Sequence, residues 1–159
     1  MKIGYACICL DPRFHFETCI QKFATESRLR SIIRANLTTL QKLLEYNAGH
    51  NIRMYRLSSD LIPFGSSPVN TIPWLQEFAA QFQSLGDYVR KHGMRVSLHP
   101  GQYCVINSPR EDVVERSIDE LWYHASILEA MGLDATHKMV LHVGGIYGDK
   151  QEAMQRFAS

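Results

Sequence analysis

Apolar and polar residues alternate along this chain with two different periods. Four short apolar runs have the length and composition of buried strands: residues 2–9, 53–57, 95–99 and 138–142. Three longer segments place apolar residues at three- and four-residue steps, which predicts amphipathic helices: residues 28–47, 74–92 and 109–131. Ser108 and Pro109 are typical of the start of the third helix, and a fourth helix is expected from Lys150 onward.

The order of these elements predicts an α/β fold. Strands that alternate with helices form a parallel sheet with right-handed crossovers, either open and doubly wound or closed into a (β/α)8 barrel. A complete TIM barrel takes about 250 residues, whereas this chain has 159 residues and about four βα units. We therefore expect a single domain over residues 1–159, which is the N-terminal half of a TIM barrel truncated within its fourth helix.

Composition supports a globular domain. Hydrophobic residues make up 45% of the chain and charged residues 21%, and the formal net charge of +1 does not indicate a strongly basic nucleic-acid binder. The four cysteines are too few for a disulfide framework, so we expect reduced thiols in a cytoplasmic protein. No apolar run approaches the roughly 18 residues of a membrane span, so we expect no membrane association.

Two histidines are the leading candidates for chemistry. His99 and His142 each end a predicted strand shortly before a glycine, and parallel strands bring their carboxyl ends to one edge of the sheet. Neutral imidazoles are common ligands of zinc, manganese and iron, so a shared metal ion is favoured over two unrelated core histidines. Two imidazoles rarely suffice for a catalytic metal, and further ligands are expected from strands outside this chain.

Gln102 and Tyr103 follow His99 in the next loop. An exposed aromatic ring beside a side-chain amide can stack on a nucleobase or replace one in a duplex. Ordinary loop packing is the alternative, and the two residue types alone favour it.

Taken together, several segments resemble the ultraviolet-damage endonuclease family of DNA repair enzymes. No single segment is specific, but the combination runs along essentially the whole chain: Gly4-Tyr5 and residues 56–63, 99–103, 108–111 and 141–150. The resemblance implies a TIM barrel and a metal-dependent endodeoxyribonuclease that uses divalent ions, typically manganese. It also implies a substrate, double-stranded DNA carrying ultraviolet photolesions, that is incised on the 5′ side of the lesion.

The resemblance also implies roles for individual residues. His99 and His142 would be metal ligands, and Tyr5 would line the catalytic site. Gln102 and Tyr103 would form the probe that wedges into the duplex at the lesion. Such a wedge costs on the order of a few kcal/mol of base stacking, and the cost is least where damage has already weakened the helix.

Two positions depart from the family pattern. Ser67 stands where the family usually has a histidine, and Cys9 where it tends to have an asparagine. A hydroxyl is a poor substitute for an imidazole, and a thiol cannot make the hydrogen bonds of an amide. Because the ligands of later strands are also missing, we expect the isolated 159 residues to have little or no nuclease activity.

Two other functions fit part of the pattern. A sugar isomerase or epimerase of the xylose isomerase-like superfamily would share the barrel and the metal histidines, but its Gln102 and Tyr103 would fold over a closed pocket. A non-catalytic half-barrel would bind a partner or dimerise through exposed apolar edges of its first and fourth strands.

Overall fold

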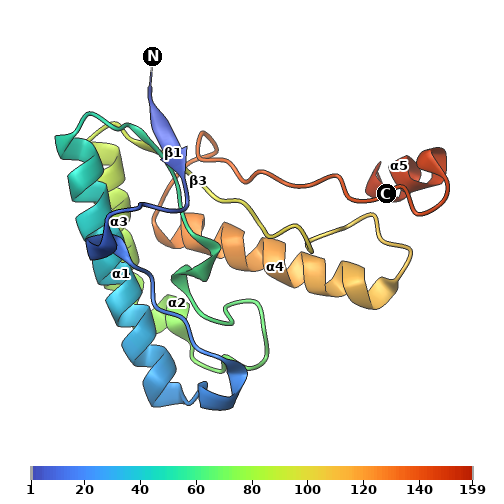
Figure 1. The fold of residues 1–159 in the computed structure, drawn as a ribbon, viewed down its shortest axis with the longest axis horizontal. Helices are drawn as coiled ribbons and strands as arrows, with labels where there is room; N and C mark the ends of the chain where they lie inside the picture. Colours follow the sequence, from blue (N-terminus) through green and yellow to red (C-terminus); the bar gives the residue numbers. More distant parts are fainter. Residues whose placement is uncertain (1, 159) are drawn as a thin grey trace.

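The computed structural model describes residues 2–158, and its strands form a three-stranded parallel sheet in the order β1-β2-β3, which lies on the side of the molecule where the N-terminus is (Figure 1). The strands are β1 (Gly4–Ala6), β2 (Met54–Arg56) and β3 (Arg95–Ser97). Their register aligns Tyr5 with Tyr55 and Tyr55 with Val96. Each strand is connected to the next through a helical segment, so the predicted βαβ alternation is confirmed for these three strands.

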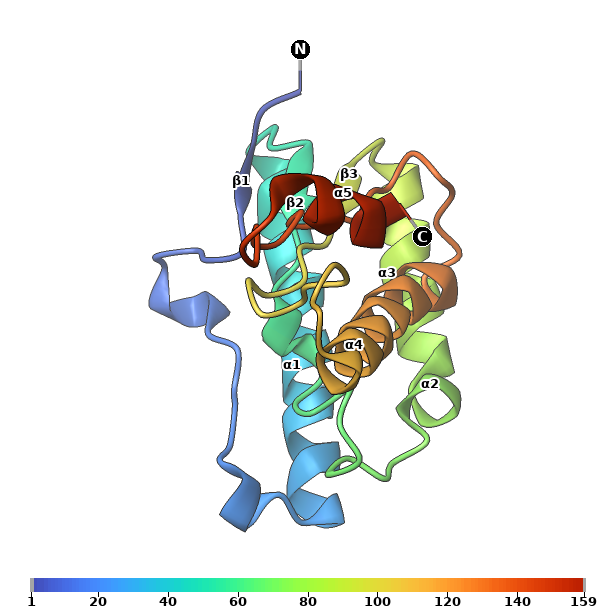
Figure 2. The ribbon, with the colours of Figure 1, turned by 90° about the vertical axis from the view of Figure 1, so that its right-hand side faces the viewer.

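Five α-helices accompany the sheet in the described part of the chain: α1 (Glu26–Gly49), α2 (Trp74–Glu77), α3 (Ala79–Lys91), α4 (Glu111–Ala130) and α5 (Lys150–Ala158). Three single-turn 3-10 helices lie in the loops: η1 (Pro12–Phe14), η2 (Gln21–Phe23) and η3 (Ser59–Leu61). Helices α1 and α3 run side by side, and α4 packs against α3 (Figures 1 and 2). Among residues 2–158, no helix is both long and apolar enough to cross a bilayer.

The hydrophobic core lies between one face of the sheet and the helices. Tyr55, Val96 and Leu98 are buried there against apolar side chains of α1 and α3. Helix α1 begins where Thr25 Oγ1 accepts a hydrogen bond from the backbone N–H of Arg28, and its leucines and isoleucines then follow the helical period. Burying one such side chain contributes about 1.5–3 kcal/mol. The apolar face of α1 therefore holds the sheet against the helices.

The predicted fourth strand, residues 138–142, is wrong as a strand. The segment makes a single parallel bridge between Leu98 and Met139, with hydrogen bonds from Leu98 N–H to Lys138 O and from Val140 N–H to Leu98 O. It pairs on one side only, because no other strand borders it among residues 2–158, and so too few ladder bonds form to extend the bridge.

Two helix predictions also need correction. The segment 74–92 is not one helix, because Phe78, at φ −111° and ψ 18°, separates α2 from α3. Helix α4 begins at Glu111 rather than Pro109, because Arg110 is still extended. Ser108 Oγ accepts a hydrogen bond from the Arg110 N–H at 3.2 Å, so this serine closes a turn before the helix instead of capping it.

The imidazole of His137 ties the segment after α4 to β3, and it makes stability depend on pH. Its Nδ1 accepts a hydrogen bond from the Val96 N–H at 3.1 Å, and burial lowers the pKa of this imidazole, with Asp134 acting in the opposite direction. An unfolded histidine titrates near a pH of about 6.5. Below that pH the unfolded state binds more protons than the folded state, so we expect the free energy of unfolding to fall as the pH drops.

Urea unfolding between about pH 7.5 and about pH 5 should show this decline, and His137→Asn should reduce it, because an amide oxygen accepts the same hydrogen bond without titrating. His15→Asn, at an exposed loop position, is the matched control. If the decline were as steep in His137→Asn as in the unmodified chain, His137 would not be its source.

Candidate functional site

The strand register divides the sheet into two faces. Tyr5, Tyr55 and Val96 share the face that packs on the helices, since Tyr55 and Val96 are buried there. Because side chains alternate along a strand, Arg56 and Ser97 lie on the opposite face, called here the inner face. A cavity of about 500 Å³ borders the inner face. His99 follows two residues after Ser97 and continues this alternation beyond the carboxyl end of β3.

The structure brings His99 and His142 together. Their ring centroids are 4.6 Å apart and the ring planes meet at 79°. His99 is half-buried and His142 is exposed. Burial lowers the pKa of His99, and the neighbouring His142, Arg56 and His124 act in the same direction. The neutral imidazole that metal ions bind is therefore favoured at neutral pH.

The histidine pair can supply part of a metal site. Two imidazoles at this separation can both reach one ion with their ring nitrogens. Among residues 2–158, no group of three or more histidine, cysteine, aspartate or glutamate side chains is arranged to hold a metal ion. A catalytic metal takes about three protein ligands, so the pair would have to be completed by donors beyond this cluster, and the metal-ligand role of both histidines stays a prediction.

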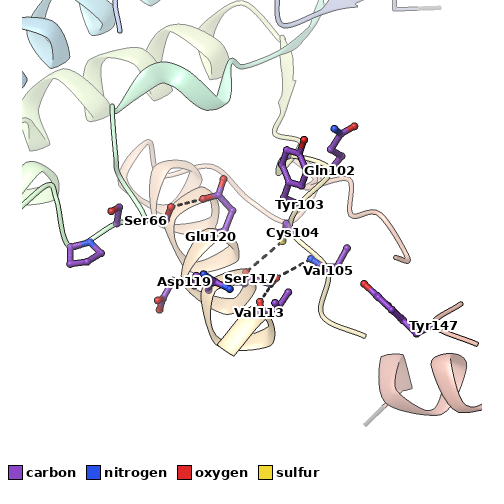
Figure 3. Close-up of a pocket in the computed structure, with 14 residues that line it drawn as sticks. Ser66, Gln102, Tyr103, Cys104, Val105, Val113, Ser117, Asp119, Glu120 and Tyr147 are labelled. Atoms are coloured by element: carbon purple, nitrogen blue, oxygen red, sulfur yellow. Dashed lines mark hydrogen bonds between the residues drawn. The ribbon is translucent and has the colours of Figure 1, made fainter. Parts of the chain in front are cut away.

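Gln102 and Tyr103 lie in the loop that follows His99. They border a groove of about 750 Å³ between this loop and α4 (Figure 3). Tyr103 is 84% exposed, so its ring projects into solvent rather than over a closed pocket. The loop behind it is fixed to α4: the Val105 N–H donates to Ser117 Oγ at 2.9 Å, and Cys104 Sγ donates to Ser117 O at 3.5 Å. These hydrogen bonds to α4 hold the loop from which the Tyr103 side chain projects.

Ser67, which departs from the family pattern, borders the same groove. Its Oγ accepts a hydrogen bond from the Val69 N–H at 3.3 Å, which closes a turn of its own loop. The neighbouring Ser66 donates to the carboxylate of Glu120 at 2.5 Å and so attaches this loop to α4 (Figure 3). The serine at position 67 therefore shapes the groove.

The structure does not bring Tyr5 to the histidine pair. Its hydroxyl donates to Asn47 Oδ1 of α1 at 2.9 Å, on the helix-facing side of the sheet, and its ring lies 5.1 Å from that of Tyr55. Burial raises the pKa of Tyr5 to about 12, although the hydrogen bond to Asn47 opposes the shift. Cys9, the other departure, lies close enough to Tyr5 to add to the increase. Tyr5 also contributes to the lining of the inner-face cavity, and its catalytic role stays a prediction.

Asn107, which the sequence pattern did not single out, joins the two histidine loops. Its Nδ2 donates to Gly145 O at 3.0 Å, and its backbone oxygen accepts a hydrogen bond from Arg156 Nε of α5 at 3.1 Å. The residue is 1% exposed. Gly144, at φ +92°, lies so close that a Cβ there would fall 2.0 Å from Asn107 Oδ1. An asparagine in a loop carries no sequence signal that would distinguish this contact from an ordinary turn.

We expect Asn107→Ala to loosen the histidine pair. The substitution removes the hydrogen bond from Asn107 to the carbonyl of the exposed Gly145, and such a bond contributes about 0.5–1.5 kcal/mol. Nuclear Overhauser effects between the His99 and His142 rings should weaken, because the His142 loop is no longer held. Asn70→Ala, which removes a hydrogen bond to Pro63 O elsewhere in the chain, is the control. Undiminished ring contacts in Asn107→Ala would show that other contacts hold the loop.

A parallel three-stranded sheet with a histidine pair beyond the end of β3 and an exposed aromatic residue in the following loop is the arrangement expected for part of a TIM-barrel protein. The crystal structure of SacUVDE superposes with a TM-score of 0.93 at 34% identity, over 99% of this chain and 54% of that chain. The family profile of UV-endonuclease UvdE matches residues 1–159, and the chain belongs to that family. The fold class and the family resemblance expected from the sequence are thereby confirmed.

Curated relatives give the same result. A UV DNA damage endonuclease of Clostridium perfringens is 43% identical over 159 residues, which is 99% of this chain and 38% of that protein. One from Bacillus pumilus is 39% identical over 132 residues, which is 83% of this chain and 41% of that protein. The chain thus spans less than half the length of these relatives.

Proposed function

We propose that this chain is the part of a metal-dependent DNA repair endonuclease that supplies two metal ligands and the lesion probe. In this proposal the protein incises double-stranded DNA on the 5′ side of ultraviolet photolesions. The observation that carries it is the convergence of His99 and His142, 4.6 Å apart at the edge of the sheet from which Tyr103 projects. Membership of the UvdE family supports the proposal.

Each part of the site would have a separate task. His99 and His142 would hold a divalent ion, manganese in this proposal, which when bound would supply a hydroxide nucleophile and stabilise charge on the phosphate. Burial keeps His99 in the neutral form that a metal binds. Gln102 and Tyr103 would enter the duplex and take the place of unstacked bases, which favours damaged sites because their stacking is already weakened.

The exposure of Tyr103 separates this proposal from a sugar isomerase. A small polyol is enclosed by its site, so the loop after His99 would fold inward over a pocket. Here the ring is 84% exposed beside an open groove, which suits an extended polymer. The exposed ring beside an open groove therefore favours a polymer substrate over a sugar.

The experiment completes the barrel with a relative. In the chimera, residues 1–159 replace the matching segment of the C. perfringens endonuclease, which is 43% identical. We expect it to incise ultraviolet-irradiated plasmid with Mn²⁺, to spare unirradiated plasmid, and to lose incision in a chelator. In the Tyr103→Ala chimera, we expect incision of irradiated DNA to fall about tenfold or more, because one stacking contact contributes about 1–3 kcal/mol.

A binding half-barrel remains a second candidate, because apolar side chains are exposed along both edges of the sheet. Ile3 and Ile8 flank β1, and Val140 and Val143 lie in the segment beside β3; all four are exposed. Such edges can pair with another chain. Gel filtration of the 159-residue chain would then show a dimer. A dimer, together with a chimera that does not incise DNA, would favour this binding function over the nuclease.

A further inference from the structure

The groove beside Tyr103 is walled by neighbouring parts of this chain. Its lining comes from the loop after β2, the loop after β3, the first half of α4 and Tyr147. Helix α4 also packs against α2 and α3. The open edges of the sheet lie elsewhere, at β1 and at the segment 138–142 beyond β3. Strands that close a barrel add at those two edges, so they would not fill this groove.

Two tyrosines from different loops border the groove, and both are exposed. Tyr147 adopts φ +52°, a conformation that a bulky residue rarely takes. Its ring lies against Gly145, where a Cβ would fall 3.4 Å from the Tyr147 Cζ. Figure 3 shows the less polar part of the lining between Tyr147 and Glu120: Cys104, Val105 and Val113. Aromatic and apolar walls of this kind suit a flat aromatic ligand.

Glu120 is the half-buried carboxylate of the groove. It accepts a hydrogen bond from the Ser66 hydroxyl at 2.5 Å. His124 Nδ1, which lies 3.5 Å from the carboxylate, instead donates to the backbone oxygen of Glu120 at 2.7 Å. Within residues 2–158, no lysine or arginine forms an ion pair with Glu120. A carboxylate has about four acceptor positions, so Glu120 can accept further hydrogen bonds from a ligand.

The charges along the groove disfavour a phosphate. Asp119 lines it together with Glu120, and the cation of the lining, Arg116, is held by Asp112 at 2.7 Å. Like charges repel, so the two carboxylates oppose an anionic ligand. An uncharged ligand with N–H donors is favoured instead, and the edge of a nucleobase with an exocyclic amine has this chemistry.

We propose that the groove binds unpaired nucleobases beside Tyr103, and that Glu120 selects bases that carry an exocyclic amine. The bases would stack on the tyrosine rings. The carboxylate would accept an N–H from the amine, as carboxylates do from N4 of cytosine. Thymine presents a carbonyl oxygen at the corresponding position and is disfavoured. As part of a damaged duplex, this ligand rests on the proposed function, whereas the affinity for an unpaired base does not.

The test compares short single strands of deoxycytidylate and thymidylate, equal in length, that bind to the 159-residue chain in the presence of a chelator. Both bases are pyrimidines, so their stacking areas are matched and the exocyclic group is the main difference. We expect the cytidylate strand to bind about fivefold or more tightly than the thymidylate strand. It should also shift the ring resonances of Tyr147 saturably.

Three variants separate the contributions. Glu120→Gln keeps an oxygen that accepts from Ser66, but its amide both donates and accepts, so we expect the two affinities to come within about twofold of each other. Glu115→Gln, which removes an equal charge from an exposed position on the same helix, should keep the preference for cytidylate. Tyr147→Ala should weaken both strands about fivefold or more, because a stacking surface is lost.

The subsite would be overturned by equal binding of the two strands to the unmodified chain, or by a preference for thymidylate. The same holds for a cytidylate preference that persists in Glu120→Gln, which would leave Glu120 as an anchor of the Ser66 loop only. The first comparison needs no variant, so it decides the question even if Glu120→Gln does not fold.

The chimera distinguishes this inference from the proposed function. Failure of the chimera to incise DNA, with the cytidylate preference intact, would reject the nuclease function and leave the subsite standing. Incision by the chimera without any preference between the two strands would reject the subsite alone.

Discussion

Gly86→Ala is expected to destabilise the protein more than any other single-methyl change in its helices. Gly86 lies in α3 where the chain passes α4, and a Cβ there would fall 1.7 Å from Met131 O and 2.6 Å from Met131 C. These are backbone atoms at the buried end of α4, so the new methyl cannot be accommodated by a side-chain rotation. The helices must separate.

Separation of α3 and α4 would also break hydrogen bonds that cross the same contact. Arg90 Nη1 donates to Met131 O at 2.9 Å, and Gln83 Nε2 donates to Ala130 O at 3.1 Å. Overpacking of this kind costs about 1–3 kcal/mol and occasionally more. The better helix propensity of alanine returns up to about 1 kcal/mol, so a cost at the upper end of that range leaves an expected net loss of about 2 kcal/mol.

Urea unfolding measures this loss as a lower midpoint at an unchanged m-value. Gly49→Ala is the matched control, since Gly49 is also helical, has no positive φ, and a Cβ there would meet no neighbouring atom within 4 Å in the described chain. It should be neutral or stabilising by up to about 1 kcal/mol. Equal effects of the two substitutions would mean that α3 and α4 are not in close contact at Gly86.

Loss of either histidine of the pair should abolish most incision by the chimera. His99→Ala or His142→Ala removes one of two imidazoles that converge at 4.6 Å. If the pair holds a divalent ion, its loss removes several kcal/mol of transition-state stabilisation. About 4 kcal/mol corresponds to a decrease in rate of about a thousandfold, so we expect at least that decrease.

Binding of damaged DNA distinguishes this effect from misfolding. His99→Ala and His142→Ala should keep their preference for irradiated DNA in chelator, because Tyr103 and its anchors on Ser117 are unchanged. Tyr103→Ala should lose that preference and keep the metal. His50→Ala is the control, since this exposed ring stacks on Tyr46 at the end of α1. Full incision by the chimera that carries His142→Ala would show that His142 is not a metal ligand.

The fold was predictable from the sequence wherever local pattern and packing agree. Leucine and isoleucine recur at helical steps in α1, and the same side chains are buried in the core. The exact ends of elements were less predictable. Ser108 and Pro109 indicated a helix start, but the chain closes a turn there and the helix begins at Glu111.

By itself, the sequence determined the parallel α/β class, placed His99 and His142 at one edge of the sheet and located the loop that carries Gln102 and Tyr103. It did so because periodicity and strand-end position are properties of short segments. Only the tertiary structure decided that Tyr5 turns toward Asn47, that Asn107 joins the histidine loops, and that Arg56 lies near His99. Those relations depend on strand register and on contacts between residues far apart in the chain, which no local pattern encodes.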